Sequence, residues 1–295
     1  MISRKRKIID KTTHFGFLLA AMFAIGITGV LIVFVFAQGL RPFLPANHYG
    51  RYGFIPFITG TVWQPDSGVY GIGYMIISTL VATFWAVIFA IPVALGTAIF
   101  TVFFAPKWLG KVVKFCVECL AGIPSVFIGI FSFIVLLPLI KKISPYAHGE
   151  SLLAVILVLA AMCLPSMCLI MISSLENVNP IYKEGGLALG TSKRQTIVRV
   201  LLPSARSGII TAVMIGAARA IGETMAVALV AGNREGGLIR SPFQTVRLLT
   251  TNIFLEQSYA TELHAQLLWS TAIVLLCFII LINLVLRRIN KGGST

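Results

Sequence analysis

Two residues of opposite charge lie inside an apolar stretch of this 295-residue chain, four positions apart. They are Arg219 and Glu223, in the string RAIGET that ends with Thr224. On an α-helix this spacing places both side chains on one face, about 6 Å apart along the axis. A guanidinium offers planar donors that match an oxyanion, and a nearby carboxylate can hold it in position. The pattern therefore predicts an anion site at Arg219, Glu223 and Thr224, with a structural ion pair as the alternative.

The surroundings of these charges follow from the composition, which is 57% hydrophobic and only 12% charged. Soluble domains carry about 25% charged residues, so this chain has too much apolar surface for one water-soluble core. Its net charge of +14 lies mainly on residues that flank apolar runs. That placement is typical of membrane topology and argues against nucleic-acid binding. Since an unpaired charge at mid-bilayer costs about 2.5 to 3.5 kcal/mol, Arg219 and Glu223 must face protein or water.

The elements that position this pair are membrane helices. Six apolar runs are long enough to cross a lipid bilayer. The sequence therefore predicts an all-α polytopic fold with helices near 17–37, 74–103, 112–140, 151–172, 208–231 and 267–286. We expect a basic cytoplasmic start over 1–16, a transmembrane domain over 17–286 and a cytoplasmic tail over 287–295.

The lysine and arginine residues predict the orientation. With the N-terminus in the cytoplasm, the inner segments hold 16 of these residues and the outer loops hold 7. The positive-inside rule then places both termini in the cytoplasm. Two long loops, 38–70 and 233–266, lie outside and have room for interfacial helices or a docking surface. A third long loop, 173–207, lies inside.

The inner loop 173–207 contains a spaced motif. It consists of Glu184, Gly185, Gly186, Gly190, Val200, Leu202 and Pro203. This set resembles the E-A-A, three residues, G, nine residues, I-x-L-P motif of ABC importer permeases, with glycines in place of both alanines. The resemblance implies a short coupling helix that docks on an ATPase subunit. Pro180 is suited to open such a helix, and Gly190 to end it in a left-handed conformation. An ordinary amphipathic loop is the alternative.

The sequence has no G-x-x-x-x-G-K-[ST] motif, so the energy must come from other subunits. The resemblance implies two ATPase subunits, which bind the ATP and magnesium. This chain would then bind no cofactor and catalyse no covalent reaction.

A narrower resemblance rests on the string Arg219 to Val227 followed by Gly232-Asn233, which is similar to the R-A-[IL]-G-E-T-M-A-V … G-N segment of the PstC family of phosphate permeases. Trp63-x-Pro65 and the segment 121–126 add to it. The family implies a type I importer of a bacterial inner membrane. Its partners would be a PstA-like second permease, two ATPase subunits and an extracytoplasmic phosphate-binding protein.

Other transport classes stay open at this point. A PstA-type sister subunit shares the loop motif and the R-A-x-G-E-T core, and sulfate or molybdate permeases share the loop motif. Ion-coupled secondary transporters also carry intramembrane charges, although no inverted repeat is evident. A membrane-embedded enzyme is disfavoured because the four histidines lack acidic or cysteine partners at ligand spacing. No metal site is predicted.

Overall fold

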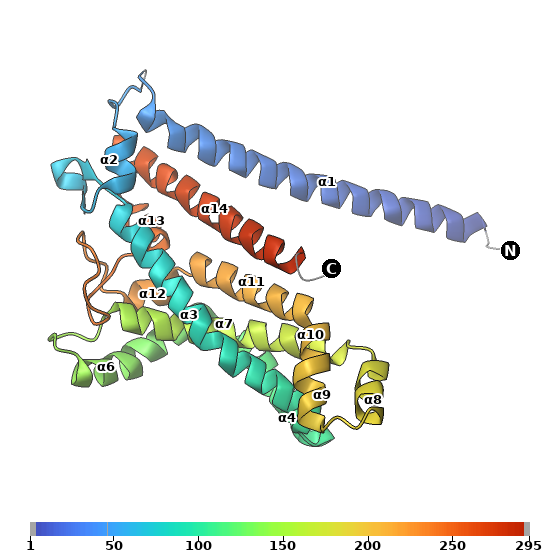
Figure 1. Cartoon of the computed structure of the whole chain (residues 1–295). Coiled ribbons are helices and arrows are strands. Elements are labelled where there is room, and N and C mark those ends of the chain that lie inside the picture. The colour runs from blue at the N-terminus through green and yellow to red at the C-terminus, as the bar shows by residue number, and fades with distance from the viewer. Residues whose placement is uncertain (1–3, 46, 292–295) are drawn as a thin grey trace.

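The computed structural model describes residues 4–45 and 47–291, and within these ranges every regular element is a helix except the two strands of one hairpin. The long helices lie side by side, with α8 at one end of the molecule and α2, α6 and α13 at the other (Figure 1). We call these the α8 end and the α13 end. The predicted all-α class is confirmed.

Four helices are long: α1 (Arg4–Leu40), α3 (Gly73–Ile99), α7 (Leu152–Glu176) and α14 (Glu262–Lys291). Shorter helices follow one another in α4 (Lys107–Ala121), α5 (Ser125–Phe131) and α6 (Leu137–Ile143). The same is true of α8 (Pro180–Ala188), α9 (Lys193–Thr196), α10 (Leu202–Ser204), α11 (Arg206–Gly222) and α12 (Met225–Val230). The long loops hold α2 (Phe54–Thr59), β1 (Trp63–Gln64), β2 (Val69–Tyr70) and α13 (Leu249–Glu256). Single 3-10 turns cover Arg41–Phe43 and Pro65–Ser67, and π-helical turns cover Phe100–Phe104, Ser132–Leu136 and Ile197–Leu201.

Five helices in the described part of the chain are long and apolar enough to cross a membrane. A sixth candidate is the pair Lys193–Ser204 and Arg206–Gly222, which is bent by 67°. The expected number of six spans is therefore reached when the bent pair counts as one. Two expected helices are interrupted. The third breaks at residues 122–124, where Pro124 disfavours helical geometry in the residue before it, and the fifth breaks at Glu223 and Thr224.

The core forms where α3 and α7 pack along their length. Every fourth residue of α3 from Ala82 to Ala98 is an alanine, and all five are fully buried. This repeat keeps the small side chains on one face and allows close approach of the two backbones. Most of α7 is buried, so it is the central helix of the bundle.

The helix α11 packs against α7 through glycine. A Cβ at Gly216 would meet Met167, and one at Gly208 would meet Ser174. The Cys163 thiol donates to the Gly216 carbonyl oxygen over 3.1 Å. At the edge of the bundle α1 lies beside α14 (Figure 1), where the Ser270 hydroxyl donates to the Gly39 carbonyl oxygen. The tight α7–α11 contact fixes the helix that carries Arg219.

The two long loops join into one cap at the α13 end. Strands β1 and β2 pair in antiparallel register, with Trp63 opposite Tyr70. The Trp63 amide donates to the Glu235 carbonyl oxygen over 2.7 Å, and Val62 forms a bridge with Gly236. The first loop is thereby attached to the second. Both loops contain short helices, as expected for 38–70 and 233–266.

Candidate functional site

Arg219 lies on α11, three residues before that helix ends at Gly222. Its side chain is partly buried. Among residues 4–45 and 47–291, its guanidinium has no hydrogen-bonding or ion-pair partner. All of its donors are therefore available to another group.

Glu223 lies outside the helix. Its backbone is extended, with φ −72° and ψ 128°, and Thr224 is also non-helical. One Glu223 carboxylate oxygen accepts a hydrogen bond from the Ala226 amide over 3.2 Å, which caps the first turn of α12. The Thr224 hydroxyl donates to the Gly222 carbonyl oxygen over 3.2 Å.

The expectation that Arg219 and Glu223 share one helical face is therefore wrong. The helix ends between them, and the described residues form no ion pair at this point. We call the non-helical residues Glu223 and Thr224, between α11 and α12, the helix gap. The helix gap brings the Arg219 guanidinium, the Glu223 carboxylate and the ends of two helices into one region. Non-helical backbone at membrane depth is tolerated only when it is buried in protein or lines a water-filled path.

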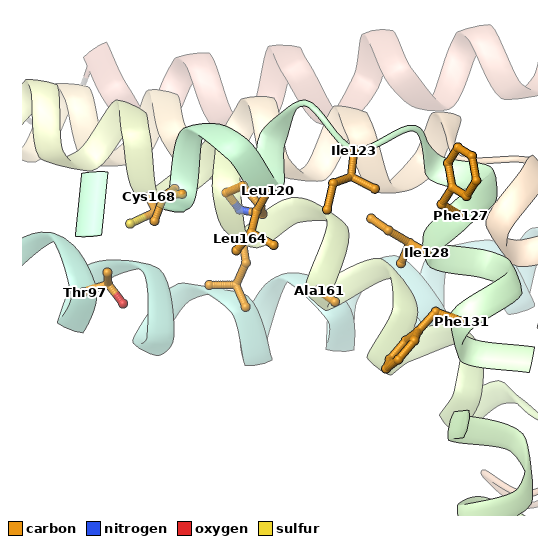
Figure 2. Close-up of a pocket in the computed structure, with 11 residues that line it drawn as sticks. Thr97, Leu120, Ile123, Phe127, Ile128, Phe131, Ala161, Leu164 and Cys168 are labelled. Atoms are coloured by element: carbon orange, nitrogen blue, oxygen red, sulfur yellow. The ribbon is translucent and has the colours of Figure 1, made fainter. Parts of the chain in front are cut away.

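An apolar groove of about 700 Å³ lies between α3, α4, α5 and α7. Figure 2 shows Phe127 and Phe131 at one end, and Thr97 and Cys168 at the other. Hydroxyl and thiol groups alone do not compensate the desolvation of an anion. The groove is therefore a poor anion site, unlike the helix gap.

The loop at the α8 end folds as the motif predicts. Pro180 is the first residue of α8, and the Asn179 side chain caps it by accepting from the Ile181 amide over 3.0 Å. Gly190 follows the helix with φ +78°, a left-handed conformation that glycine adopts without strain. Ser192 and Gln195 then form a reciprocal capping box on α9.

The surface of α8 is exposed and rich in apolar side chains. Leu189 is 86% exposed and Ile181 is 68% exposed, while Tyr182 and Leu187 are also open. Glu184 and Gly185 are exposed, and Gly186 is buried. An unpartnered apolar surface of this kind can bind another protein.

Gly186 faces the rest of the loop. A Cβ there would lie 2.9 Å from the Thr196 Cγ2, so alanine would require Thr196 to move. The Thr191 hydroxyl donates to the Gly186 carbonyl oxygen over 2.7 Å and lies 2.8 Å from the Thr196 hydroxyl. The glycine that departs from the family motif therefore matches its local environment.

The motif residues Val200 and Leu202 are partly buried and Pro203 is exposed. We call residues 193–205, which lead from the α8 loop into α11, the arm. Its buried residues lie outside the motif and are Thr196, Ile197, Leu201 and Ala205. Ile197, Leu201 and Ala205 recur every four residues, a helical pattern that identifies the inner face.

A second polar cluster lies at the α13 end, and sequence reasoning missed it. Glu256 accepts hydrogen bonds from the Trp63 indole nitrogen at 2.6 Å and from Arg247 Nη1 at 2.7 Å. Its other contact is with His264 Nε2 at 2.7 Å. All four side chains are at least nine-tenths buried. We call them the Glu256 cluster.

The ionisation of Glu256 follows from its partners. Burial alone raises the pKa of this carboxyl, but hydrogen bonds from His264 and Trp63, together with the Arg247 charge, bring the pKa below its ordinary value. The carboxylate is therefore an acceptor, and His264 Nε2 carries the hydrogen of their contact. Trp63 belongs to the Trp63-x-Pro65 match, but no motif links it to the other three residues, since it lies 193 positions before Glu256.

The chain matches the family of binding-protein-dependent transport system inner membrane components over residues 90–292. It is 35% identical to the probable ABC transporter permease protein YqgH of Bacillus subtilis (strain 168), over 92% of this chain and 87% of that protein. It is 33% identical to the phosphate transport system permease protein PstC of Xylella fastidiosa (strain 9a5c), over 80% of each chain.

The fold is similar to that of solved transporters. A chain from a bacterial ABC transporter involved in import of the acidic polysaccharide alginate aligns with a TM-score of 0.63 at 16% identity, covering 97% of this chain and 99% of that one. A chain of the MetNI methionine ABC transporter aligns with a TM-score of 0.61 at 19% identity, covering 76% and 98%.

The chain belongs to the binding-protein-dependent transport system inner membrane component family. It is a multi-pass permease subunit of an ABC importer, a class that operates with ATPase subunits and a substrate-binding protein.

Proposed function

We propose that this chain is the PstC-type permease of a phosphate importer and forms half of its translocation pathway. One copy pairs with a PstA-like second permease, two ATPase subunits and an extracytoplasmic phosphate-binding protein. The chain lies in a bacterial inner membrane with the α8 end and both termini in the cytoplasm. ATP and magnesium are bound by the ATPase subunits, and this chain carries out no covalent chemistry.

The proposed anion site rests mainly on one observation, which is that Arg219 has no hydrogen-bonding or ion-pair partner in the described part of the chain. If the charges served only to fix helix packing, Arg219 and Glu223 would satisfy each other, yet the helix break separates them. A partly buried guanidinium with free donors is a suitable transient partner for a phosphate oxyanion. Glu223 has a second carboxylate oxygen that can accept the proton of hydrogen phosphate. Sulfate at neutral pH has no such proton, so Glu223 favours phosphate.

The coupling surface is α8, whose exposed apolar side chains are available to a cleft on an ATPase subunit. ATP-driven closure of the two ATPases draws the coupling helices together and opens the pathway outward. Gly190 and the Ser192 capping box connect α8 to the arm that continues into α11. Movement of α8 therefore acts on the helix that carries Arg219.

The test is uptake of radiolabelled phosphate by the complex reconstituted in proteoliposomes. We expect Arg219→Gln to reduce uptake at least tenfold and Glu223→Gln to reduce it less, with normal assembly of the complex. Arg206→Gln is the matched control because Arg206 is an exposed residue at the start of the same helix. Unchanged uptake in both site variants would remove the helix gap from the mechanism.

Sulfate and molybdate uptake in the same vesicles tests the substrate. Preference for either anion over phosphate would replace the phosphate assignment while leaving the importer class intact. Full transport by the charge-exchanged variant Arg219→Glu with Glu223→Arg would indicate a purely structural role for the two charges.

A further inference from the structure

A residue from a distant part of the chain donates a hydrogen bond at the helix gap. The Thr250 hydroxyl donates to the Glu223 carbonyl oxygen over 3.0 Å, across 27 positions of sequence. Thr250 is in the first turn of α13 and is 96% buried. The hydrogen bond satisfies a carbonyl that has left the helical pattern of α11.

The first turn of α13 is itself fixed against the membrane bundle. The Leu249 amide donates to the Thr79 hydroxyl of α3 over 3.1 Å. The Thr79 hydroxyl in turn donates to the Met75 carbonyl oxygen over 2.8 Å. Thr250 therefore projects from a turn that is hydrogen-bonded to α3 through the neighbouring Leu249.

The last residue of α13 is Glu256, and the Glu256 cluster fixes this end of the helix to three other segments. Trp63 comes from the first long loop, Arg247 from the segment before α13, and His264 from α14. Arg247 also donates through Nε to the Asn233 carbonyl oxygen over 3.2 Å. Asn233 follows the end of α12, so Thr250 and Arg247 are hydrogen-bonded to residues on either side of that helix.

The geometry shows what this attachment prevents. If residues 206–230 formed one continuous helix, Arg219 and Glu223 would be four residues apart on one face, where an ion pair forms readily. The guanidinium would then be occupied by Glu223. A hydrogen bond from Thr250 to the Glu223 backbone stabilises the broken form, in which the guanidinium is free.

We propose that α13 is a positioning strut, in which Thr250 maintains the break at Glu223 and thereby keeps Arg219 available for the anion. The inference rests on the proposed anion site and assigns Thr250 as a positioning residue, since it acts through Glu223. The Glu256 cluster holds the strut to both long loops at the α13 end. A partner that contacts these loops is thereby linked through α13 to the anion site.

The experiment compares Thr250→Val, which keeps the shape and removes the hydroxyl, with Thr250→Ser, which keeps the hydroxyl. In proteoliposomes containing the full complex, we expect Thr250→Val to lower phosphate uptake about tenfold. Thr250→Ser should stay within about twofold of the unmodified protein. Ser258→Val, an exposed change in the loop after α13, is the matched control and should have no effect. Wild-type uptake by Thr250→Val would overturn the inference that Thr250 maintains the break at Glu223.

A double-variant cycle separates positioning from general packing. Glu223→Gln removes the charge that would pair with Arg219. In that background, adding Thr250→Val should lower phosphate uptake less than twofold. A full tenfold loss in that background would show that Thr250 acts by packing alone and would overturn the inference. If Thr250→Val fails to assemble, the cycle is repeated with Thr250→Ala; failure of both would assign Thr250 to folding and likewise overturn it.

The same data distinguish this inference from the proposed function. Unchanged uptake in Arg219→Gln and Glu223→Gln removes the anion site itself. If uptake falls in those variants but is normal in Thr250→Val, only the positioning role of α13 is rejected.

Discussion

The two ends of the molecule use polar and apolar residues in opposite ways. At the α8 end, Leu189 and Ile181 are exposed, and the polar groups of the loop mostly cap its own short helices. At the α13 end, charged side chains are buried in the Glu256 cluster and connect segments far apart in sequence. The first arrangement leaves an apolar surface open, and the second joins distant segments through buried hydrogen bonds.

This difference has a physical basis. A local loop with caps forms from short-range hydrogen bonds, so it keeps its shape while its outer face stays open. A buried ionised group is stable only when all its partners are in place, so its loss affects every segment that it joins. We therefore expect variants at the α8 end to impair coupling without unfolding, and variants in the Glu256 cluster to impair folding.

The largest effect is expected at the α8 end. Glu184→Lys and Gly190→Asp should abolish transport-linked ATP hydrolysis while the permease stays in the membrane, because they change the docking face and the turn that ends α8. Stimulation of hydrolysis by loaded binding protein is the measurement. Glu118→Lys, an exposed charge reversal on α4, serves as the control. Normal stimulation in the α8 variants would contradict a docking role.

The next effect concerns the cluster at the α13 end. Glu256→Ala leaves Arg247 buried without its carboxylate and should lower the free energy of unfolding by about 3 to 5 kcal/mol. Thermal unfolding of the detergent-purified protein measures the loss. Glu235→Ala, at an exposed carboxylate of the same loop, should change it by less than about 0.5 kcal/mol. Equal stability of the two variants would contradict the expectation that the Glu256 cluster stabilises the fold.

The smallest effect is a dependence on pH. The pKa of Glu256 is lowered in the folded protein, so its ionised form stabilises the fold above the ordinary glutamate pKa of about 4.3. That contribution is lost as the pH falls through the lowered value. The melting temperature should therefore be insensitive to Glu256 between about pH 7 and 5 and should drop below about pH 4.

Glu256→Gln has no proton to gain at this position, so its melting temperature should fall less steeply in acid. An acid transition that is identical in Glu256→Gln would exclude this carboxylate as its source.

Much of the fold was predictable from local sequence. The apolar runs identify the spans because the bilayer requires about 20 apolar residues per helix. Pro180, Gly190 and the Ser192 to Gln195 spacing identify the α8 loop, because caps and left-handed turns depend on nearby residues. The break at residues 122–124 could also be predicted from the sequence, since it coincides with Pro124.

The break at Glu223 was not predictable in the same way. No proline lies in the string RAIGET, and its spacing suits a continuous helix. The interruption involves a hydrogen bond from Thr250, which lies 27 residues later in a separate loop. A pattern within one helix carries no information about that partner.

The sequence by itself determined that this chain spans a membrane, that one of its loops has the ABC importer coupling motif, and which charged residues lie at membrane depth. These properties depend on composition and on neighbours within one or two helical turns. Only the tertiary structure decided that Arg219 has no ion-pair partner within residues 4–45 and 47–291, and that Glu256 joins four segments. Hydrogen bonds between distant segments form only after the helices have packed, so their partners are set by the fold as a whole.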